Sequence, residues 1–406
     1  PQGKTIYHRA PRAYEQISSD SIEIEAPPQL NHAKGQPLSL MLGPSITMAF
    51  PMILGCMLMA YSSKGSGGSS LYMYSGLIMS VSSAVLGVFW SMANVRYQKK
   101  EEGEQGKIRF SAYSQYLQEK TAEVKERYEQ TMQMLQEVYP DADSCLEYDE
   151  AKGILWNRNA SHKDFMKFRL GLGNIPFQMA INVPKEKFQL YKDELNEKPR
   201  FIKENYDVLY DVPVTLDLAE HNLIGIVGGN KKAGAIEIAK VLSAQIAANN
   251  CYTDVKMGFI YNKDSYQEEE NWNFAKWLPH VWSEDKRTRY IASDMEQASD
   301  VFYELTNIFR TRLEEQKETK AKENTIPKPY YVLFVSDISA LEGALLAKYV
   351  FEKENTYGLT TILLTEHYEE LPNVCDFIIE NTKEFQGMYL TSASESQRQK
   401  ICFDHV

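Results

Sequence analysis

Two long runs without charge constrain this sequence most. Residues 38–61 and 71–95 each exceed 20 residues and contain no Asp, Glu, Lys or Arg. About 20 apolar residues let a helix cross a hydrocarbon core about 30 Å thick. Only the short segment SSKGSGGSS, residues 62–70, separates the runs. We therefore expect a hairpin of two transmembrane helices at residues 37–95. The alternative is a pair of buried helices in a soluble protein.

Basic residues predict the orientation of this hairpin. Arg96, Lys99 and Lys100 follow the second run, and further basic residues precede the first, whereas the connecting loop carries only Lys64. Because positively charged flanks stay in the cytoplasm, both ends of the hairpin are expected there and the loop outside. This predicts a two-pass protein of the cell membrane with both termini cytoplasmic, in which residues 1–36 are a cytoplasmic linker with one strand near residues 21–25.

The two runs differ in what shapes them. Pro44 and Pro51 are expected to kink the first helix, because proline removes a backbone hydrogen bond. The second run carries small residues at helical spacing, which lets another helix approach closely. That other helix is either the first run or a partner protein. The small residues are Gly76, Ser80, Ser83 and Gly87.

Residues 96–200 are predicted to form a stalk that begins with a long charged helix. Within residues 96–140, one set of residues recurs every seven positions and a second set lies four residues after the first, as in a short coiled coil. The alternative is an amphipathic helix packed on its own domain. The two sets are Leu117, Val124, Thr131 and Val138, and Thr121, Tyr128 and Leu135.

From about residue 201 the pattern becomes α/β. Apolar strands alternate with helical stretches, notably at residues 295–316 and 341–352, and such alternation predicts a mainly parallel sheet. We therefore expect one P-loop-NTPase-like domain at residues 201–406. The expected strands are residues 213–218, 223–227, 255–261, 330–336, 359–364 and 376–379.

Residues 223–235, LIGIVGGNKKAGA, have the frame of a phosphate-binding loop: a strand, a glycine turn and a helix over residues 233–248. The chemistry of such a loop is missing. With Gly228 as the first glycine of GxxxxGK[ST], Gly234 stands at the lysine position and Ala235 at the magnesium-binding hydroxyl position. We predict a degenerate nucleotide site. The alternative is a site that binds nucleotide through Lys231 or Lys232.

A second motif is also incomplete. The strand that precedes Asp337 resembles a Walker B strand, but Ile338 follows where ring-forming ATPases carry a catalytic glutamate. As structure alone, Asp337 caps the next helix. We predict no catalytic residue, no metal ligand and no assigned cofactor in this segment. The tentative nucleotide-binding residues are Gly228, Gly229, Lys231, Lys232, Gly234 and Asp337.

Composition limits the partners. A net charge of −11 argues against binding to nucleic acid, which requires a basic surface. Five cysteines without a C-x-x-C pair indicate reduced thiols. The aromatic segment at residues 272–282 is expected to be packed structure, with a partner-binding surface as the alternative. The run of three glutamates at residues 268–270 is expected to be a solvated loop.

Five motifs resemble one family. They are LWNR at residues 155–158, DF at 164–165, RLGLG at 169–173, DVPVTLDL at 211–218 and WNFAKWLPHVW at 272–282. In order and spacing the chain is similar to the membrane-bound FtsK/SpoIIIE-type ATPases of type VII secretion, the EssC/EccC proteins. The resemblance covers essentially the whole chain and implies the membrane segment, the stalk and the first ATPase-like domain.

The resemblance has further implications. The parent protein is expected to continue past Val406 into ATPase domains that use ATP with Mg²⁺, and forkhead-associated domains are expected before Pro1. The implied partners are the lipid bilayer, other membrane components of the secretion machine, further copies of the chain and, through later domains, small secreted WxG-type proteins. This segment is then a membrane anchor and pseudo-ATPase. Two rival functions are an NTPase with an atypical site and an FtsK-like DNA translocase.

Overall fold

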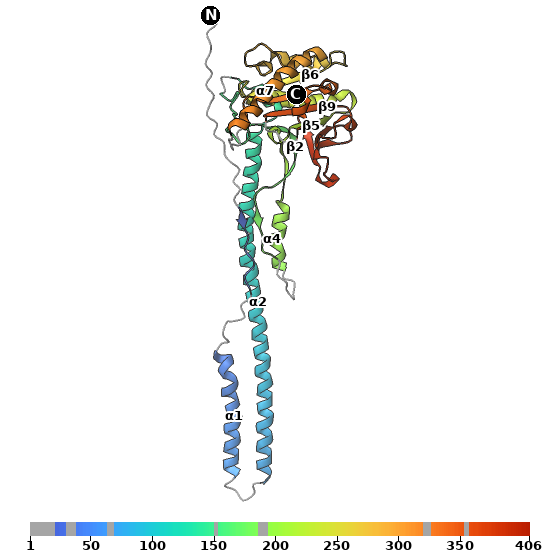
Figure 1. The fold of residues 1–406 in the computed structure, drawn as a ribbon. Helices are drawn as coiled ribbons and strands as arrows, with labels where there is room; N and C mark the ends of the chain where they lie inside the picture. The colour runs from blue at the N-terminus through green and yellow to red at the C-terminus, as the bar shows by residue number, and fades with distance from the viewer. Residues whose placement is uncertain are drawn as a thin grey trace. The chain divides into compact units, whose positions relative to one another are not determined.

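The computed structural model describes residues 21–29, 38–62, 69–149, 153–185, 194–319, 326–352 and 357–406. The chain divides into two compact units (Figure 1). The larger unit contains residues 126–179 and 206–406, and the smaller contains residues 20–125 and 180–205. The helices are α1 Leu38–Ser62, α2 Ser69–Val138, α3 Ala142–Leu146, α4 Glu194–Asn205, α5 Ala233–Asn249, α6 Glu268–Trp272, α7 Met295–Thr319 and α8 Ala347–Val350.

The strands form one short and one large sheet. In the smaller unit β1 and β3 pair in parallel, so the strand expected near residues 21–25 is present. The strands are β1 Ile22–Glu23, β2 Lys167–Pro176, β3 Ile181–Asn182, β4 Val208–Asp217, β5 Leu223–Val227, β6 Val255–Ile260, β7 Ile291–Ala292, β8 Tyr330–Val335, β9 Leu359–Thr365, β10 Phe377–Asn381, β11 Gln386–Leu390 and β12 Gln399–Phe403.

In the smaller unit, α1 contacts the first part of α2 through glycines. A Cβ added at Gly43 would overlap the Trp90 indole, and one at Gly55 would overlap the Met79 sulfur. The Trp90 Nε1–H donates to Thr47 Oγ1 at 2.8 Å. Of the small residues predicted on the second run, an added Cβ at Gly87 would lie 3.5 Å from Met48 Cε, whereas one at Gly76 would meet no atom within 4 Å. Large side chains of α2 therefore fill the glycine positions of α1.

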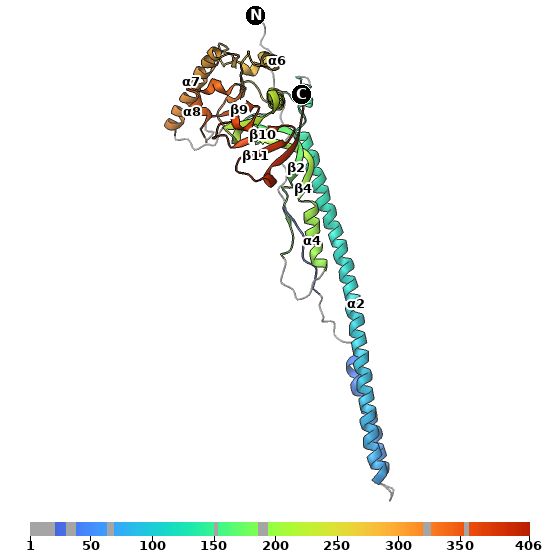
Figure 2. The same cartoon turned by 90° about the vertical axis from the view of Figure 1, so that its right-hand side faces the viewer.

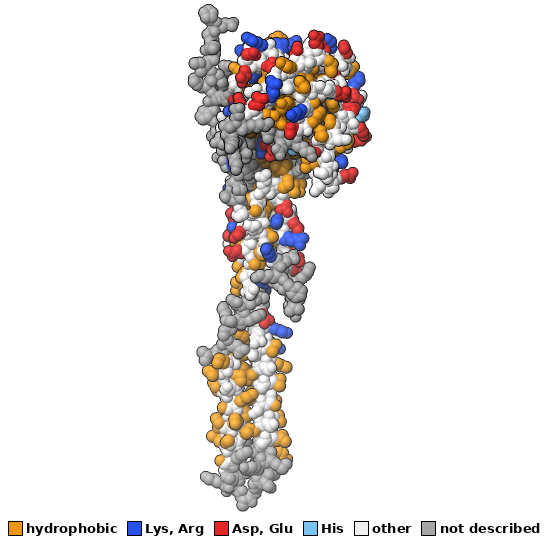
Figure 3. Space-filling view, viewed as in Figure 1, with side chains coloured by type: hydrophobic (Ala, Val, Ile, Leu, Met, Phe, Trp, Pro, Cys, Tyr) orange, Lys and Arg blue, Asp and Glu red, His pale blue; other side chains and the backbone are white. Residues whose placement is uncertain are grey.

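The outer surface of α1 and the start of α2 is apolar. Met41 and Phe50 are among many large apolar side chains that are more than half exposed, and Figure 3 shows hydrophobic side chains over this helix pair. Among the described residues, one helix is long and apolar enough to cross a membrane, with an 18-residue window at Leu40–Met57. Residues 63–68, in the predicted external loop, and several side chains of the second run lie outside the described part. The two-pass hairpin therefore remains a prediction.

The larger unit contains a sheet of ten strands in the order β4-β2-β12-β11-β10-β5-β9-β8-β6-β7 (Figure 2). From β10 to β7 every neighbouring pair is parallel, and from β10 to β4 every pair is antiparallel. The parallel half contains the strands expected at residues 223–227, 255–261, 330–336, 359–364 and 376–379. The prediction of an α/β domain with a mainly parallel sheet is confirmed.

Alternating side chains along the strands bury both faces of this sheet. Ile224 and Ile226 of β5 join the core that includes α5. Leu223 and Val227 join the core on the other face, which includes α7. Burial on both faces is typical of parallel sheets covered by helices on each side. The helix expected at residues 341–352 is largely absent: a short 3-10 turn at Ile338–Leu341 and the four-residue α8 take its place.

The sheet extends beyond the expected domain boundary at residue 201. Strand β2 comes from the segment predicted as stalk, residues 96–200, yet it pairs with β12 and β4. Its RLGLG motif explains the close pairing. A Cβ added at Gly171 or Gly173 would lie well within 3.0 Å of a carbonyl oxygen of β12, closer than real Cβ atoms come. Strand β2 is therefore part of the larger unit.

The seven-residue pattern of α2 is buried partly against its own domain. In the larger unit Leu135 packs with Phe177, Leu209 and Val212, and Tyr128 contacts this cluster. The Tyr128 hydroxyl also donates to the carbonyl oxygen of Val208 at 3.1 Å. At this end of the helix the packing matches the second interpretation, an amphipathic helix on its own domain.

The aromatic segment at residues 272–282 is mostly packed structure, as expected. Trp272 contacts Phe259 and Phe334 in the core, although Trp277 is 80% exposed. His280 is completely buried, and its Nε2 donates to the carbonyl oxygen of Asn250 at 2.7 Å. Desolvation lowers the pKa of His280 to about 4.

His280 therefore predicts a loss of stability in acid. The ring of the unfolded chain takes up a proton below a pH of about 6.5, while the ring in the folded protein stays neutral until a pH of about 4. The free energy of unfolding therefore falls by up to about 3 kcal/mol as the pH drops through this window. His280→Gln should reduce the fall in unfolding free energy between pH 7 and 4.5, measured by chemical denaturation. His405→Gln, at a ring that is 71% exposed, is the control. Equal losses in the wild type and His280→Gln would contradict the prediction.

Candidate functional site

The candidate site lies at the carboxyl ends of the parallel strands, where α/β proteins bind ligands. The glycine loop follows β5 and leads directly into α5, as predicted. Strand β8, which precedes Asp337, is separated from β5 by β9. Lys232 bridges the two motifs, because its Nζ donates to the backbone carbonyl oxygen of Ser336. The structure thus brings the loop and the end of β8 together.

Most backbone amides named in the glycine loop already donate hydrogen bonds to carbonyl oxygens of the protein. The amide of Gly228 donates to Thr365 O at 2.9 Å, and that of Gly229 to Glu366 O at 3.1 Å. The amides of Lys232, Ala233 and Gly234 donate to carbonyl oxygens within the loop. A phosphate-binding loop directs such amides at its ligand. Here they are already paired with protein carbonyls, so the cradle for a phosphate is largely filled.

Gly234, at the lysine position of the motif, has no room for a side chain. A Cβ there would lie well within 3.0 Å of the backbone oxygen of Asn381, at the end of β10. The Asn381 side-chain amide also donates to Gly234 O at 3.2 Å. Because the obstacle is backbone, a rotamer change cannot remove it. The loss of the motif lysine is therefore built into the packing of β10 against the start of α5.

The two lysines that precede Gly234 have other partners. Lys231 places its Nζ 3.4 Å from the centre of the Tyr266 ring, a cation–π contact. Both lysines adopt left-handed backbone conformations, with φ of 55°, which L-residues rarely adopt. Lys232 is tied to Ser336 as described above. These contacts hold the two ammonium groups against different partners, and they do not direct them together at one phosphate.

One expectation near this site is wrong. Glu268, expected in a solvated loop, is only 4% exposed and begins α6. Its carboxylate accepts hydrogen bonds from Trp272 Nε1–H at 2.6 Å and from the Ser336 hydroxyl at 2.5 Å. Burial of this charge is offset by two hydrogen bonds. Sequence reasoning missed Glu268 because its partner Ser336 lies 68 residues away.

Asp337 caps the turn that follows β8, which is the structural role considered for it from the sequence. Its Oδ1 accepts from the backbone amide and the hydroxyl of Ser339, at 3.1 and 2.5 Å, and so caps the following 3-10 turn. Asp337 borders a pocket of about 380 Å³ at the ends of β6 and β8, together with Asp264 and Asp294. The glycine loop does not line that pocket. Within the described residues, no group of three or more His, Cys, Asp or Glu side chains could hold a metal ion.

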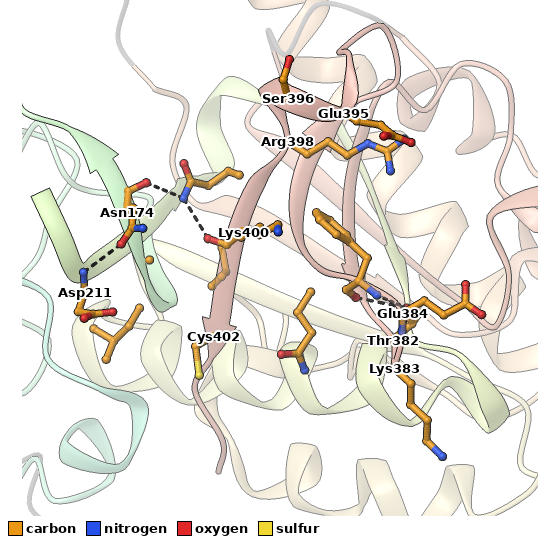
Figure 4. A pocket seen from close by; sticks show the side chains of 16 residues that line it. Asn174, Asp211, Thr382, Lys383, Glu384, Glu395, Ser396, Arg398, Lys400 and Cys402 are labelled. Carbon is orange, nitrogen blue, oxygen red and sulfur yellow. Dashed lines mark hydrogen bonds between the residues drawn. The ribbon is translucent and has the colours of Figure 1, made fainter. Parts of the chain in front are cut away.

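Another pocket lies on the antiparallel half of the sheet. It has a volume of about 1040 Å³ and runs from Asn174 and Asp211 across β12 to the turn at Thr382 (Figure 4). Two amide groups in its lining donate hydrogen bonds to Asn174. Gln399 Nε2 donates to Asn174 O at 2.8 Å, and the backbone N–H of Asp211 donates to Asn174 Oδ1 at 3.3 Å. Basic and acidic side chains alternate in its lining, which favours a solvated groove over a site for one charged ligand.

Comparisons with known proteins test the resemblance. No family model matches the chain. It is 22% identical to the type VII secretion system protein EssC of Staphylococcus aureus (strain MSSA476) over 402 residues, 98% of this chain. It is 24% identical to the ESX secretion system protein EccC of Geobacillus thermodenitrificans (strain NG80-2) over 94% of this chain. The chain is related to the EssC/EccC proteins of type VII secretion.

The EssC/EccC relationship confirms the resemblance drawn from the motifs. This chain spans only about a quarter of each relative, 26% of the EssC and 24% of the EccC. Two solved structures are also similar. The first is EssC (ATPases 2 and 3) from Geobacillus thermodenitrificans, with a TM-score of 0.39 and 11% identity, and the match covers 59% of this chain and 44% of that one. The second is the cytoplasmic domain of EssC, with a TM-score of 0.34 and 14% identity, and the match covers 57% of this chain and 59% of that one.

The closed loop predicts that restoring the motif lysine fails to restore a nucleotide site. Gly234→Lys should lower the unfolding free energy by about 1–3 kcal/mol, because the new side chain must displace the backbone at Asn381. It should add no thermal shift with Mg-ATP. Gly103→Lys, where an added Cβ meets no atom within 4 Å on α2, is the matched control. A stable Gly234→Lys protein that gains a shift with Mg-ATP would contradict the closed loop.

Proposed function

We propose that this chain is the membrane anchor, stalk and pseudo-ATPase portion of a type VII secretion motor. The observation that carries the proposal is the pairing of a secretion-family sequence with a P-loop frame whose lysine position is blocked by Asn381. In this view residues 37–95 embed in the cell membrane, residues 96–200 form the stalk, and residues 201–406 form the ATPase-like domain. The domain transmits or gates the activity of motor domains elsewhere in the protein.

The membrane anchor is supported by exposure and charge. The many large apolar side chains on the surface of α1 and early α2 would be unfavourable in water. The hydrogen bond from Trp90 to Thr47 pairs two polar groups between the helices, as required within a bilayer. The basic residues after the second run keep both termini in the cytoplasm in this proposal.

The pseudo-ATPase role is supported by the residues around the loop. Gly228, Gly229 and Gly234 lack free space or free amides for a phosphate, and Lys232 is bound to the end of β8. Asp337 caps a turn and is followed by Ile338. Turnover by this segment would require these contacts to open. ATP with Mg²⁺ is assigned to the motor domains of the parent protein, and the proposal assigns no catalytic or metal-binding role to the described residues of this segment.

The partners follow from the family. Other membrane components of the secretion machine and further copies of this chain are the proposed neighbours of the anchor. Export of small WxG-type proteins is proposed for the whole protein through its later domains. One solved relative is EccC ATPases 2 and 3 in complex with a signal sequence peptide, and substrate contact through such domains is part of this proposal. Nucleic acid is not a proposed partner, because the chain is acidic.

The second candidate is an NTPase with an atypical site. One observation favours it: Lys232 reaches the carbonyl of Ser336, at the end of the Walker B-like strand, from the glycine loop. A phosphate that displaced this carbonyl would recruit the same ammonium group. In that case Lys232→Ala should abolish nucleotide binding. A DNA translocase is the third function considered, and the net charge of −11 argues against the basic surface that it would need.

The anchor predicts the topology of the chain. In intact cells, a cysteine introduced by Ser66→Cys in the loop between the runs should react with a membrane-impermeant maleimide. A cysteine introduced by Glu102→Cys, beyond the second run, should react only after the cells are opened. The background variant carries Cys56→Ser and Cys402→Ser, because these thiols are exposed. Labelling of both positions from outside, or of neither, would refute the two-pass orientation.

The pseudo-ATPase predicts an absence of turnover. The purified full chain in detergent should release phosphate from Mg-ATP no faster than buffer, and Asp337→Ala should leave that rate unchanged, because Asp337 only caps a turn. An Asp337→Ala change should lower the free energy of unfolding by about 1 kcal/mol through the lost cap. Measurable release that disappears in Asp337→Ala would replace this proposal by the NTPase alternative.

A further inference from the structure

We propose that the motif arginines Arg158 and Arg169 couple the C-terminal end of α2 to α5, the helix that starts at the glycine loop. The inference rests on the proposed function, in which the domain transmits movement rather than hydrolyses ATP, and names the path of transmission. Every residue in it belongs to the larger unit. The two helices end at the same short segment, residues 156–169, which supplies partners to both.

Arg158 binds the end of α2 from within the protein. It is 3% exposed, and its Nη2 donates to Val138 O, the last residue of α2, at 3.0 Å. Its Nη1 donates to Lys167 O at 2.5 Å, and its Nε lies 3.5 Å from Asp164 Oδ2. The last carbonyls of a helix lack intrahelical partners and carry partial negative charge. A buried, paired guanidinium therefore stabilises this helix end.

Arg169 binds the next carbonyl. Its Nη1 donates to Tyr139 O at 3.3 Å. Its Nε and Nη2 form a two-pronged ion pair with Asp404 at 2.8 and 3.0 Å. Asp404 directly follows β12, and burial raises the pKa of its carboxyl while Arg169 opposes that rise. The end of α2 is thereby fixed to β2, which carries Arg169, and to the end of β12.

The same segment also binds the end of α5. The backbone amide of Trp156 donates to Ala248 O at 2.8 Å, and its indole to Ala247 O at 2.9 Å. The amide of Arg158 donates to Asn249 O at 3.0 Å. The last free carbonyls of α5 are thus satisfied by the LWNR motif. Trp156 has a φ of 56°, a strained conformation that these hydrogen bonds offset.

Gln245 of α5 completes the link. Its Oε1 accepts from the Arg169 amide at 3.0 Å, and its Nε2 donates to Arg169 O at 2.6 Å. Gln245 is 3% exposed, so both hydrogen bonds are shielded from water. A shift of α5 along its axis must break these bonds or carry Arg169 with it. Because Arg169 holds Tyr139 O, the end of α2 follows.

The test is hydrogen exchange of the full chain, with the end of α2 as the readout. Gln245→Leu removes both hydrogen bonds to the backbone of Arg169. It leaves the hydrogen bonds of the Arg158 and Arg169 side chains in place. It should speed amide exchange at residues 135–139 by at least about threefold. Ser243→Ala is the matched control, since Ser243 is also fully buried on α5 and its hydroxyl bonds only within the helix, to Ala239 O at 2.6 Å.

A reciprocal variant guards against misfolding of Gln245→Leu. Arg169→Lys keeps the charge beside Asp404 but cannot form the fork. It should speed exchange both at residues 135–139 and at residues 246–249 of α5. Faster exchange at only one of these helix ends, or an equal effect of Ser243→Ala at residues 135–139, would overturn the coupling. The readout involves no ATP and no membrane, so its failure leaves the proposed function standing, and turnover by the chain would not affect it.

Discussion

The backbone oxygen of Asn381 occupies the space that a P-loop lysine needs, and much of the domain follows from that contact. Strand β10 must pass close to the start of α5 to make it. Because the same strand turns into β11, the parallel half of the sheet continues into the antiparallel strands β11, β12, β2 and β4. The strand that contacts Gly234 is therefore also the strand at which the antiparallel half of the sheet begins.

Three buried charged side chains of this acidic chain have polar partners. Arg158 and Arg169 each combine a carboxylate with a helix-end carbonyl, and Glu268 is held by a hydroxyl and an indole. Removing one partner of such a group is costly, because a buried charge is left without compensation. These motif residues are thus explained by the construction of the domain. Arg158 and Arg169 lie between the C-terminal end of α2 and the C-terminal part of α5.

The parts of the fold with local signals could be predicted. Apolar runs located β5, β6, β8, β9 and β10, and helical spacing located α5 and α7. Strands β2, β11 and β12 were missed. For β2, the partner strand β12 lies more than 200 residues away, so no local pattern indicates the pairing. The expected helix at residues 341–352 was wrong, since its apolar residues are instead used to pack short turns against the sheet. Periodicity does not distinguish a helix from such packed turns.

The features of the candidate site also fall into those that the sequence shows and those that only the folded structure shows. The assignment of Gly234 and Ala235 to the lysine and hydroxyl positions of the motif needs only the sequence, and it stays a prediction. The closure by Asn381 could not be read from the sequence, because it joins residues 147 positions apart, and neither could the pairing of Lys232 with Ser336 or the burial of Glu268. These contacts are set by strand order, which the local pattern leaves open.

The central claim is that the backbone amides of the glycine loop are paired with protein carbonyls and do not bind a nucleotide. Calorimetric titration of Mg-ATP into the purified full chain tests it most directly. We predict no heat beyond that of dilution. A saturable heat that is lost in Lys232→Ala would show that the loop opens to admit a nucleotide, and would contradict the account.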